Sequence, residues 1–572
     1  MASTPDHKLI IYQLLPRLFG NTNTNNKFYG SIEENGCGKF NDITCTALKA
    51  IKDMGFTHIW YTGVIEHATM TDHTAYGIKR DDPDVVKGRA GSPYAIKDFY
   101  DVAPDLAVSI PDRMAEFEAL IARTHQQGMK VLIDLVPNHV ARTYASDVKP
   151  DGVRDIGEDD DVTKAFSPTN DLYYIPGQRF TVPQGYDPGG PEFVDPLKDG
   201  QFDEYPAKGT GDDVFTPSPS VNNWFETVKL NYGVDFNGGY HCHFDPVPPL
   251  WNKILHILSY WADKGVEGFR CDMVEYVPTE FWAWLIPQMK ERYPGIIFIG
   301  EAYRTGEYRN YLFHGQFDYL YDKVGLYDAL KRLIRDEHGA STWQINAVWN
   351  HDSQGIDERM LRFLENHDEQ RIASPYFAGD AWLAIPAMIV TATLNTGPVM
   401  IYFGQEVGEP AAGAQGFSGD DGRTSIFDYC PVPEHQKWLN DGQCDGGRLS
   451  EDQQQLRSFY RTLLNVTTKH EAITHGSFYE LMMANEREWG FDDKLYLYLR
   501  YTDQQRLLIA VNFSRHERNF NIRIPADLLQ QWGLNGAIEL TDLLTGKLIS
   551  TADINGGVAA VLPASGGLIL QF

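Results

Sequence analysis

The sequence is poor in cysteine, in long apolar runs, and in basic residues relative to acidic ones. Its 572 residues include six cysteines and no Cys-x-x-Cys pair, which excludes a disulfide framework and the common zinc and redox motifs. The chain has 50 lysines and arginines against 78 aspartates and glutamates, and a net charge of −28 would repel the phosphates of a nucleic acid. No apolar run approaches the roughly 20 residues that cross a bilayer. We expect neither nucleic acid binding nor membrane insertion.

The amino terminus also lacks the features of a secretion signal. Residues 1–15 (MASTPDHKLIIYQLL) contain no basic stretch followed by an uninterrupted apolar core. The chain as it stands is therefore expected in the cytoplasm, with a periplasmic or secreted location as the alternative if a leader was removed. Cys430 and Cys444 flank a polar loop, where free thiols are favoured over a bridge. We expect a monomer or a weak homo-oligomer.

The sequence does contain a series of short apolar runs that alternate with helical patterns. Seven runs are typical of buried strands in a parallel sheet, at residues 9–15, 57–64, 130–136, 265–272, 295–301, 360–366 and 398–404. Residues 316–320 are the candidate for the sixth strand in chain order. Helical patterns cover residues 110–126, 249–264 and 278–292. Repeated alternation of this kind indicates a (β/α)8 barrel or a doubly wound sheet.

Two regions depart from this alternation. Residues 141–247 are rich in glycine, proline, aspartate and tyrosine and have no clear periodicity, so they are expected to form a subdomain inserted after the third strand. From about residue 477 onward, short strand patterns separated by turn residues predict a separate all-β domain. With these regions, the length of the chain fits two or three domains.

Polar residues suited to catalysis follow several of the predicted strands. Asp272, Glu301 and Asp368 each come directly after or close behind an apolar run. In (β/α)8 barrels the strand ends meet at one face, where the chemistry takes place. Carboxyl groups gathered there suit glycoside hydrolysis with retention, in which one attacks the anomeric carbon and another donates a proton to the leaving oxygen. Arg270 lies two residues before Asp272, on the same side of a strand, where it could keep Asp272 ionised.

Taken together, the motifs resemble the α-amylase superfamily, glycoside hydrolase family 13. They are DLVPNH (134–139), GFRCD (268–272), FIGE (298–301) and ENHD (365–368), supported by VKLN (228–231) and GPVMIYFGQE (397–406). The resemblance covers the whole chain and implies an α/β fold. A (β/α)8 TIM barrel would comprise residues 1–140 and 248–476 (domain A), with domain B (141–247) inserted after strand three and an all-β sandwich, domain C, at 477–572.

The resemblance also implies roles for individual residues. Asp272 would be the nucleophile, Glu301 the general acid and base, and Asp368 the stabiliser of the transition state. A second set would hold the sugar or support the acids: Arg270, His139, His367, Tyr94 and Asp134. The substrate would be an α-glucan or a maltooligosaccharide. The chemistry itself would need no cofactor.

The sequence departs from the family pattern just after the predicted nucleophile. Typical members carry Lys-His three and four residues after the nucleophile, where this chain has Glu275 and Tyr276, so Glu275 would contact the acceptor-side sugar in a different way. The missing His normally contributes to a structural Ca²⁺ site, of which Asn138 is a remaining candidate ligand. An acidic cluster at residues 155–161 and the alternating asparagines at 21–25 are further oxygen-rich loops, expected to be a solvated loop and a turn.

The predicted activity is hydrolysis of α-1,4-glucosidic bonds in starch, glycogen or maltooligosaccharides by double displacement. Exo-acting α-glucosidases usually carry Asp at the position of Gly91, so the glycine favours cleavage within the glucan chain. A 4-α-glucanotransferase or an exo-acting α-glucosidase is the alternative, since they share the catalytic acids. A non-catalytic carbohydrate-binding member is less favoured, because such proteins lose one or more of the acids and this chain keeps all three.

Overall fold

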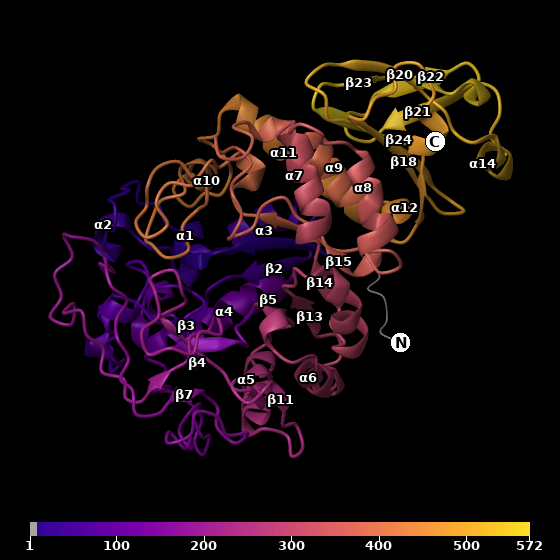
Figure 1. The fold of residues 1–572 in the computed structure, drawn as a ribbon. Coiled ribbons are helices and arrows are strands. Elements are labelled where there is room, and N and C mark those ends of the chain that lie inside the picture. Colours follow the sequence, from indigo (N-terminus) through magenta and orange to yellow (C-terminus); the bar gives the residue numbers. More distant parts are fainter. Residues whose placement is uncertain (1–7) are drawn as a thin grey trace.

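A closed ring of parallel strands forms the centre of the protein. In the computed structural model, which describes residues 8–572, eight strands form one parallel sheet in the spatial order β15-β14-β13-β12-β5-β2-β1-β16 (Figure 1). A further parallel bridge between Arg362 and Val399 joins the two ends of this order and closes the barrel. The strands are β1 (Ile10–Leu14), β2 (His58–Tyr61), β5 (Lys130–Leu135), β12 (Gly268–Cys271), β13 (Ile297–Gly300), β14 (Tyr319–Tyr321), β15 (Met360–Leu361) and β16 (Val399–Tyr402).

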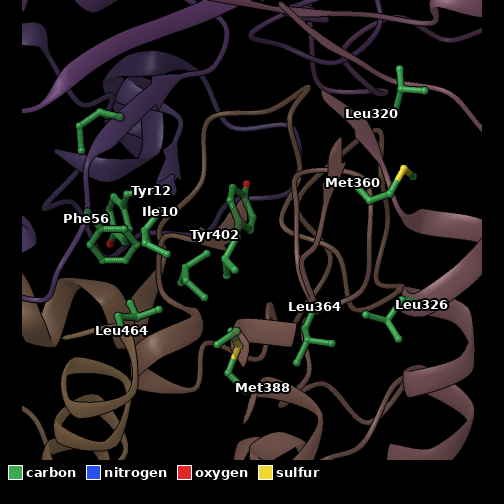
Figure 2. Packing of buried hydrophobic residues seen from close by; sticks show 14 of the residues in the cluster. Ile10, Tyr12, Phe56, Leu320, Leu326, Met360, Leu364, Met388, Tyr402 and Leu464 are labelled. Carbon is green, nitrogen blue, oxygen red and sulfur yellow. The ribbon is translucent and has the colours of Figure 1, made fainter. Parts of the chain in front are cut away.

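The barrel strands are buried on both faces, as their apolar sequences predict. Alternate residues of the strands point into the barrel, where Ile11, Trp60, Leu132, Ile299 and Met400 pack together. Their neighbours point outward to the helices: Tyr12 packs against Phe56 with ring centroids 4.8 Å apart, close to Ile10 (Figure 2). Each large apolar side chain buried in this way contributes about 1.5–3 kcal/mol to folding.

The predicted barrel is confirmed, with shifts at two strands. The sixth strand, expected at 316–320, is β14 at Tyr319–Tyr321, because Gln316 adopts a left-handed φ of 65° and belongs to a turn. The seventh, expected at 360–366, is assigned only at Met360–Leu361, after which the chain leaves the sheet towards His367 and Asp368. Short strands suffice here because both neighbours of β14 pair with it in parallel register.

Helices cover the outside of the barrel. The three predicted helical segments correspond to α4 (Arg113–Gln126), α5 (Pro249–Asp263) and α6 (Thr279–Arg292). Helix α5 places Leu250, Ile254, Leu258 and Trp261 on one buried face, the spacing of an amphipathic helix. The other helices are α1 (Pro16–Phe19), α2 (Ile32–Asn35), α3 (Cys45–Lys52), α7 (Asp328–Ile334), α8 (Trp343–Ala347), α9 (Ile385–Thr393), α10 (Pro433–Leu439), α11 (Glu451–Lys469), α12 (Glu471–Thr474), α13 (Met482–Asn485) and α14 (Ala526–Gln531).

The segment after the third barrel strand has little regular structure. It forms two-stranded pairs: β6 (His139–Ala141) with β9 (Thr227–Lys229), β7 (Tyr174–Ile175) with β8 (Ala207–Lys208), and β10 (Val234–Asp235) with β11 (His241–Cys242). In the loop between β2 and α4, β3 (Ile65–His67) pairs with β4 (Ile96–Val102). The pairing of β6 with β9 brings the far end of the inserted segment back to the end of β5, directly beside the barrel.

The carboxyl-terminal region is an antiparallel β structure, as predicted. A six-stranded sheet has the order β17-β18-β19-β24-β21-β22, and β20 pairs with β23 in a second sheet. The region lies at one end of the molecule, beside α9 (Figure 1). Its strands are β17 (Ser477–Glu480), β18 (Leu495–Tyr501), β19 (Arg506–Asn512), β20 (Arg518–Ile522), β21 (Ile538–Asp542), β22 (Leu548–Thr551), β23 (Val558–Leu562) and β24 (Gly566–Gln571).

No helix within residues 8–572 is long and apolar enough to cross a membrane. All six cysteines are free, including Cys430 and Cys444.

A single buried arginine fastens the carboxyl-terminal sheet to the barrel. Arg500 on β18 donates to the carbonyl oxygens of Leu394, Ala472, Ile473 and Gly476, at 2.6–3.2 Å. Leu394 follows α9 and the other three belong to α12 and the turn after it, so one side chain joins three segments.

Arg500→Met is expected to destabilise the protein strongly. It keeps much of the buried apolar volume but leaves three buried carbonyl groups and the partly buried one of Gly476 without this donor, which should cost about 3 kcal/mol or more. The thermal midpoint should fall by about 2–3 °C or more. Arg487→Met is the matched control, because the Arg487 side chain is 93 % exposed; equal midpoints for both variants would contradict this account.

Candidate active site

A cavity lies at the carboxyl ends of the barrel strands, where the sequence predicts the catalytic groups. Its volume is about 260 Å³. All three predicted acids line it, together with the predicted sugar-binding residues Tyr94 and His139. The remaining lining residues are Lys87, Ser92, Trp224, Glu226, Thr227, Met273, Tyr303, Ile426 and Phe427.

The guanidinium of Arg270 holds two of the acids together. Its Nη1 donates to Asp272 Oδ1 at 2.8 Å, and its Nη2 forms an ion pair with Glu301 Oε2, also at 2.8 Å. Arg270 itself is 1 % exposed, and its Nε donates to the hydroxyl of Tyr321 on β14. Because the two nitrogens belong to one planar group, both carboxyls face the same small volume of the cavity.

The groups around Asp272 act on its pKa in opposite directions. Burial and the neighbouring Glu301 carboxyl raise the pKa of Asp272 well above its usual range, whereas Arg270 lowers it. The guanidinium therefore favours the charged form of Asp272, which is the form that a nucleophile needs.

Asp368 differs from the other two acids because it is held in its charged form. Its Oδ2 lies 3.0 Å from His367 Nε2, and 43 % of its side chain is exposed to the cavity. Burial alone would raise the pKa of Asp368, but His367 and the charge of Arg270 lower it to about 2. His367 is oriented from both sides, since its Nδ1 contacts Gln13 on β1 at 2.8 Å and its Nε2 contacts the Tyr94 hydroxyl at 2.6 Å.

Asp134 lies beneath the cavity, as the resemblance implies. Its Oδ2 accepts hydrogen bonds from Trp60 Nε1 at 3.1 Å and from the Gly63 backbone, and its Oδ1 accepts one from the Tyr94 hydroxyl at 3.3 Å. The ring of Tyr94 stacks on His367 with the planes 24° apart. Tyr94 is thereby fixed in position before any ligand binds.

His139 lines the cavity together with Trp224. Its ring packs 5.3 Å from Trp224, and burial and the nearby Lys229 lower the pKa of His139 to about 3. A neutral imidazole can give or accept a hydrogen bond to a sugar hydroxyl without adding charge.

Glu275 does not line the cavity, which corrects the expectation that it contacts the sugar. Its Oε1 accepts from the backbone nitrogens of Tyr303 at 3.0 Å and Arg304 at 2.6 Å, and Oε2 pairs with the Arg304 guanidinium. Glu275 therefore fixes the turn that follows β13. Tyr303 on this turn donates to Glu301 Oε1 at 2.6 Å.

Asn138 does not fit the role of a calcium ligand. Its side-chain oxygen accepts from Lys229 Nζ at 2.5 Å and its amide nitrogen donates to the Gly211 carbonyl at 2.7 Å. An ammonium group therefore already lies where a cation would bind to this oxygen. The residue is completely buried.

The other oxygen-rich loops are held by hydrogen bonds within the chain, as expected. In the acidic cluster, Asp160 accepts from the backbones of Asp171 and Leu172, and Arg154 pairs with Glu158 and Asp159. At residues 21–25, the side-chain oxygens of Asn21 and Asn23 each accept from the backbone nitrogen two residues on. These are Asx turns.

Gly91 has a purely steric explanation. Its φ is +78°, and an added Cβ would lie 1.7 Å from the Ala68 carbonyl oxygen. The backbone admits no side chain at this position. The conformation of the loop therefore explains the glycine, and its presence is weak evidence for endo over exo action.

Several residues of the site escape prediction from sequence alone. Tyr303 could have been found, since it lies two residues after Glu301 and so points to the same side of the chain. Gln13 and Trp224 belong to segments far from the acids in sequence, and nothing in their local pattern marks them. Lys229 lies in the VKLN motif, but the motif does not show which groups its ammonium contacts.

Tyr303→Phe tests whether the phenol orients the acid. Burial and Glu301 raise the pKa of Tyr303, so its hydroxyl stays protonated and donates to Glu301. Without this bond the Glu301 carboxyl loses a contact that holds it in place, so kcat/KM should fall by about tenfold. Tyr311→Phe, whose hydroxyl contacts Arg304, should leave kcat/KM unchanged. Equal values of kcat/KM for both variants would refute the orienting role.

Comparisons with known proteins agree with this geometry. The family described as alpha amylase, catalytic domain, matches residues 13–160 and 247–476. Among curated proteins, Alpha-amylase 3 of Dictyoglomus thermophilum is 21 % identical over 75 % of each chain, and the probable oligo-1,6-glucosidase 3 of Bacillus subtilis is 22 % identical over 88 % of this chain and 90 % of its own.

Solved structures share the fold at low sequence identity. The α-amylase of Geobacillus thermoleovorans, in complex with acarbose, has a TM-score of 0.63 and 18 % identity, with 98 % of each chain covered. The debranching enzyme of Nostoc punctiforme has a TM-score of 0.62 and 18 % identity over 100 % of each chain. Since the family match extends over more than half of the residues and includes all three acids, the chain belongs to the α-amylase family and is an enzyme of the glycosidase type, acting on glucans as a hydrolase or a transferase.

Proposed function

We propose that this enzyme hydrolyses α-1,4-glucosidic bonds of starch, glycogen or maltooligosaccharides with retention of configuration. The observation that carries the proposal is the Arg270 guanidinium, which contacts Asp272 and Glu301 at 2.8 Å each. Retaining glycosidases need their two carboxyl groups close together, about 5–5.5 Å apart, because one attacks the sugar directly. Two carboxyls bridged by one guanidinium suit this short separation better than the wider one that an inverting enzyme needs to admit a water molecule.

The first step of the proposed reaction forms a covalent intermediate. Asp272 Oδ attacks the anomeric carbon while the bond to the leaving oxygen breaks, and Glu301 gives its proton to that oxygen. This step needs Glu301 protonated and Asp272 charged, and the pairing of Arg270 with Asp272 stabilises the charged nucleophile. The Tyr303 hydroxyl, 2.6 Å from Glu301, orients the acid.

The second step returns the enzyme to its starting state. Glu301, now ionised, removes a proton from water, and the water oxygen replaces Asp272 at the anomeric carbon. Two displacements at one carbon retain its configuration. Asp368, charged at neutral pH, is placed to bind sugar hydroxyls and to favour the positive charge that develops on the ring, while Tyr94 offers its ring to the sugar face.

A glucanotransferase is the second candidate, favoured by one observation. Tyr303 adjoins Glu301, and the acid must face the leaving group, so an aromatic ring lies on the side where an acceptor sugar would enter. Trp224 adds a second aromatic ring to the cavity wall. Aromatic rings stack on sugars and would help an acceptor to displace water. The relatives include both kinds of protein, among them a maltosyltransferase from Cereibacter sphaeroides.

Substitution of the two bridged acids should separate their roles. Asp272→Asn should abolish both hydrolysis and the covalent intermediate, with a loss of activity of at least about 10⁴-fold. Glu301→Gln should lose about 10²–10⁴-fold on maltooligosaccharides but far less on an activated aryl glycoside, whose leaving group needs no proton. The measurements are kcat/KM on both substrates and mass spectrometry of the trapped enzyme. Asp503→Asn, an exposed surface carboxylate, is the control. Near wild-type rates in the two active-site variants would refute the assignment.

The products formed from maltoheptaose distinguish the candidate activities. Shorter maltooligosaccharides, with none longer than the substrate, are expected from the hydrolase. Products longer than seven units would establish a transferase, and glucose alone from the earliest times would establish an exo-acting α-glucosidase. A time course by chromatography, run at several substrate concentrations, measures all three outcomes. Absence of any turnover by the wild-type enzyme would favour a carbohydrate-binding protein.

A further inference from the structure

Three oxygen atoms from separate segments converge on one buried ammonium group beside the cavity. Lys229 Nζ lies 2.5 Å from Asn138 Oδ1, 3.1 Å from the Tyr276 carbonyl oxygen and 2.7 Å from Asp213 Oδ1. The Lys229 side chain is 2 % exposed. Two aromatic rings, those of Phe236 and Tyr276, cover the ammonium with centroids 5.4 and 5.1 Å away.

These contacts join the inserted segment to two barrel strand ends. Asn138 follows β5, and Tyr276 ends the short helical turn after β12. Lys229 lies on β9 and Asp213 on a loop of the inserted segment, where it adopts a left-handed φ of 61°. The charge of one lysine therefore fixes the inserted segment against the strands that carry His139 and Asp272.

The three oxygens form the kind of donor set that binds a hard divalent cation. A carboxylate, a side-chain amide oxygen and a backbone carbonyl are typical ligands of Ca²⁺. Asn138 is the remaining candidate ligand of the family's structural Ca²⁺ site, a site that the loss of the family's Lys-His pair already puts in doubt, and the Asn138 oxygen is bound by Lys229. The disagreement has a direct physical origin, because an ammonium and a divalent cation cannot share one cradle of oxygens.

We propose that the ammonium of Lys229 takes the place of a bound divalent cation between the inserted segment and the barrel. The three oxygens become a cation site only when the lysine is removed. The inference concerns the support of the active site and does not depend on which glucan the enzyme cleaves.

Energetics favour a charged lysine here in spite of its burial. Burial lowers the pKa of Lys229, and Asp213 opposes this effect. An ammonium has three N–H donors, and the cradle supplies three acceptors. Unlike a divalent ion, it is covalently attached and cannot dissociate. Lys229 also pairs across the strands with His139, so loss of the ammonium removes the positive charge closest to that imidazole.

The experiment compares thermal stability and ion binding of Lys229→Ala with the wild type. Removal of the ammonium leaves Asp213, Asn138 and the Tyr276 carbonyl without this partner and should lower the thermal midpoint by roughly 3–4 °C in EDTA. Added Ca²⁺ should recover most of this loss in the variant and raise the midpoint of the wild type by much less. Tb³⁺, excited through nearby Tyr276 and Trp224, should show additional luminescence in the variant that Ca²⁺ displaces.

Lys253→Ala is the matched control. Lys253 is a half-buried lysine on α5 that bonds two oxygens of the inserted segment, the Asp155 carbonyl at 2.7 Å and Asp171 Oδ2 at 2.5 Å. It should lose stability without gaining a response to Ca²⁺. The double variant Lys229→Ala/Asp213→Asn should lose the response that Lys229→Ala gains.

Several outcomes would overturn the proposal. One is an unchanged midpoint in Lys229→Ala; another is a Ca²⁺ response no larger than those of the wild type and Lys253→Ala. If Lys229→Ala is insoluble when produced without added ion, recovery of folded protein in Ca²⁺ supports the proposal. The variant Lys229→Gln, which keeps most of the side-chain volume without the charge, then serves as a further test. Because this side chain still fills the space between the oxygens, the proposal requires a smaller response to Ca²⁺ in Lys229→Gln than in Lys229→Ala.

Discussion

The placement of one buried guanidinium among carboxyl groups governs the architecture of the site. Arg270 is 1 % exposed, and it contacts Asp272, Glu301 and the Tyr321 hydroxyl. A charge at this depth is stable only if every neighbour compensates it, which requires the ends of β12, β13 and β14 to stay in fixed register. The barrel closes around this group. The strands are short because the residues that follow them, such as Asp272 after β12 and Glu301 after β13, leave the sheet and form the site.

The protein uses buried positive charges to join separate segments. Arg270 positions the acids, and Arg500 holds the carboxyl-terminal sheet through four carbonyl groups. Lys229 performs a comparable task where the inserted segment returns to the barrel. Apolar packing also joins α9 to the carboxyl-terminal sheet. Directional bonds to a charge fix the geometry at such junctions, since hydrophobic burial is not directional.

Much of the fold and the catalytic acids could be predicted from the sequence because their causes are local. Apolar runs of strand length between amphipathic helices indicate a parallel sheet that is buried on both faces. Asp272 and Glu301 follow such runs directly. Strand ends were less predictable: Gln316 looks like part of a strand, but its backbone turns at a φ of 65°. The local sequence carries little information about where a sheet partner stops.

The supporting contacts of the site could not be predicted, because they depend on segments brought together only by the fold. Glu275 has the charge and position of a sugar ligand, yet the turn after β13 presents two backbone N–H groups that bind it first. Asn138 has the chemistry of a metal ligand, yet a lysine 91 positions later in the chain reaches its oxygen. A buried acceptor binds the nearest available donor, and three-dimensional proximity decides which donor that is. Residue type therefore predicts which chemistry is available at a position, and the fold decides whether substrate, ion or protein uses it.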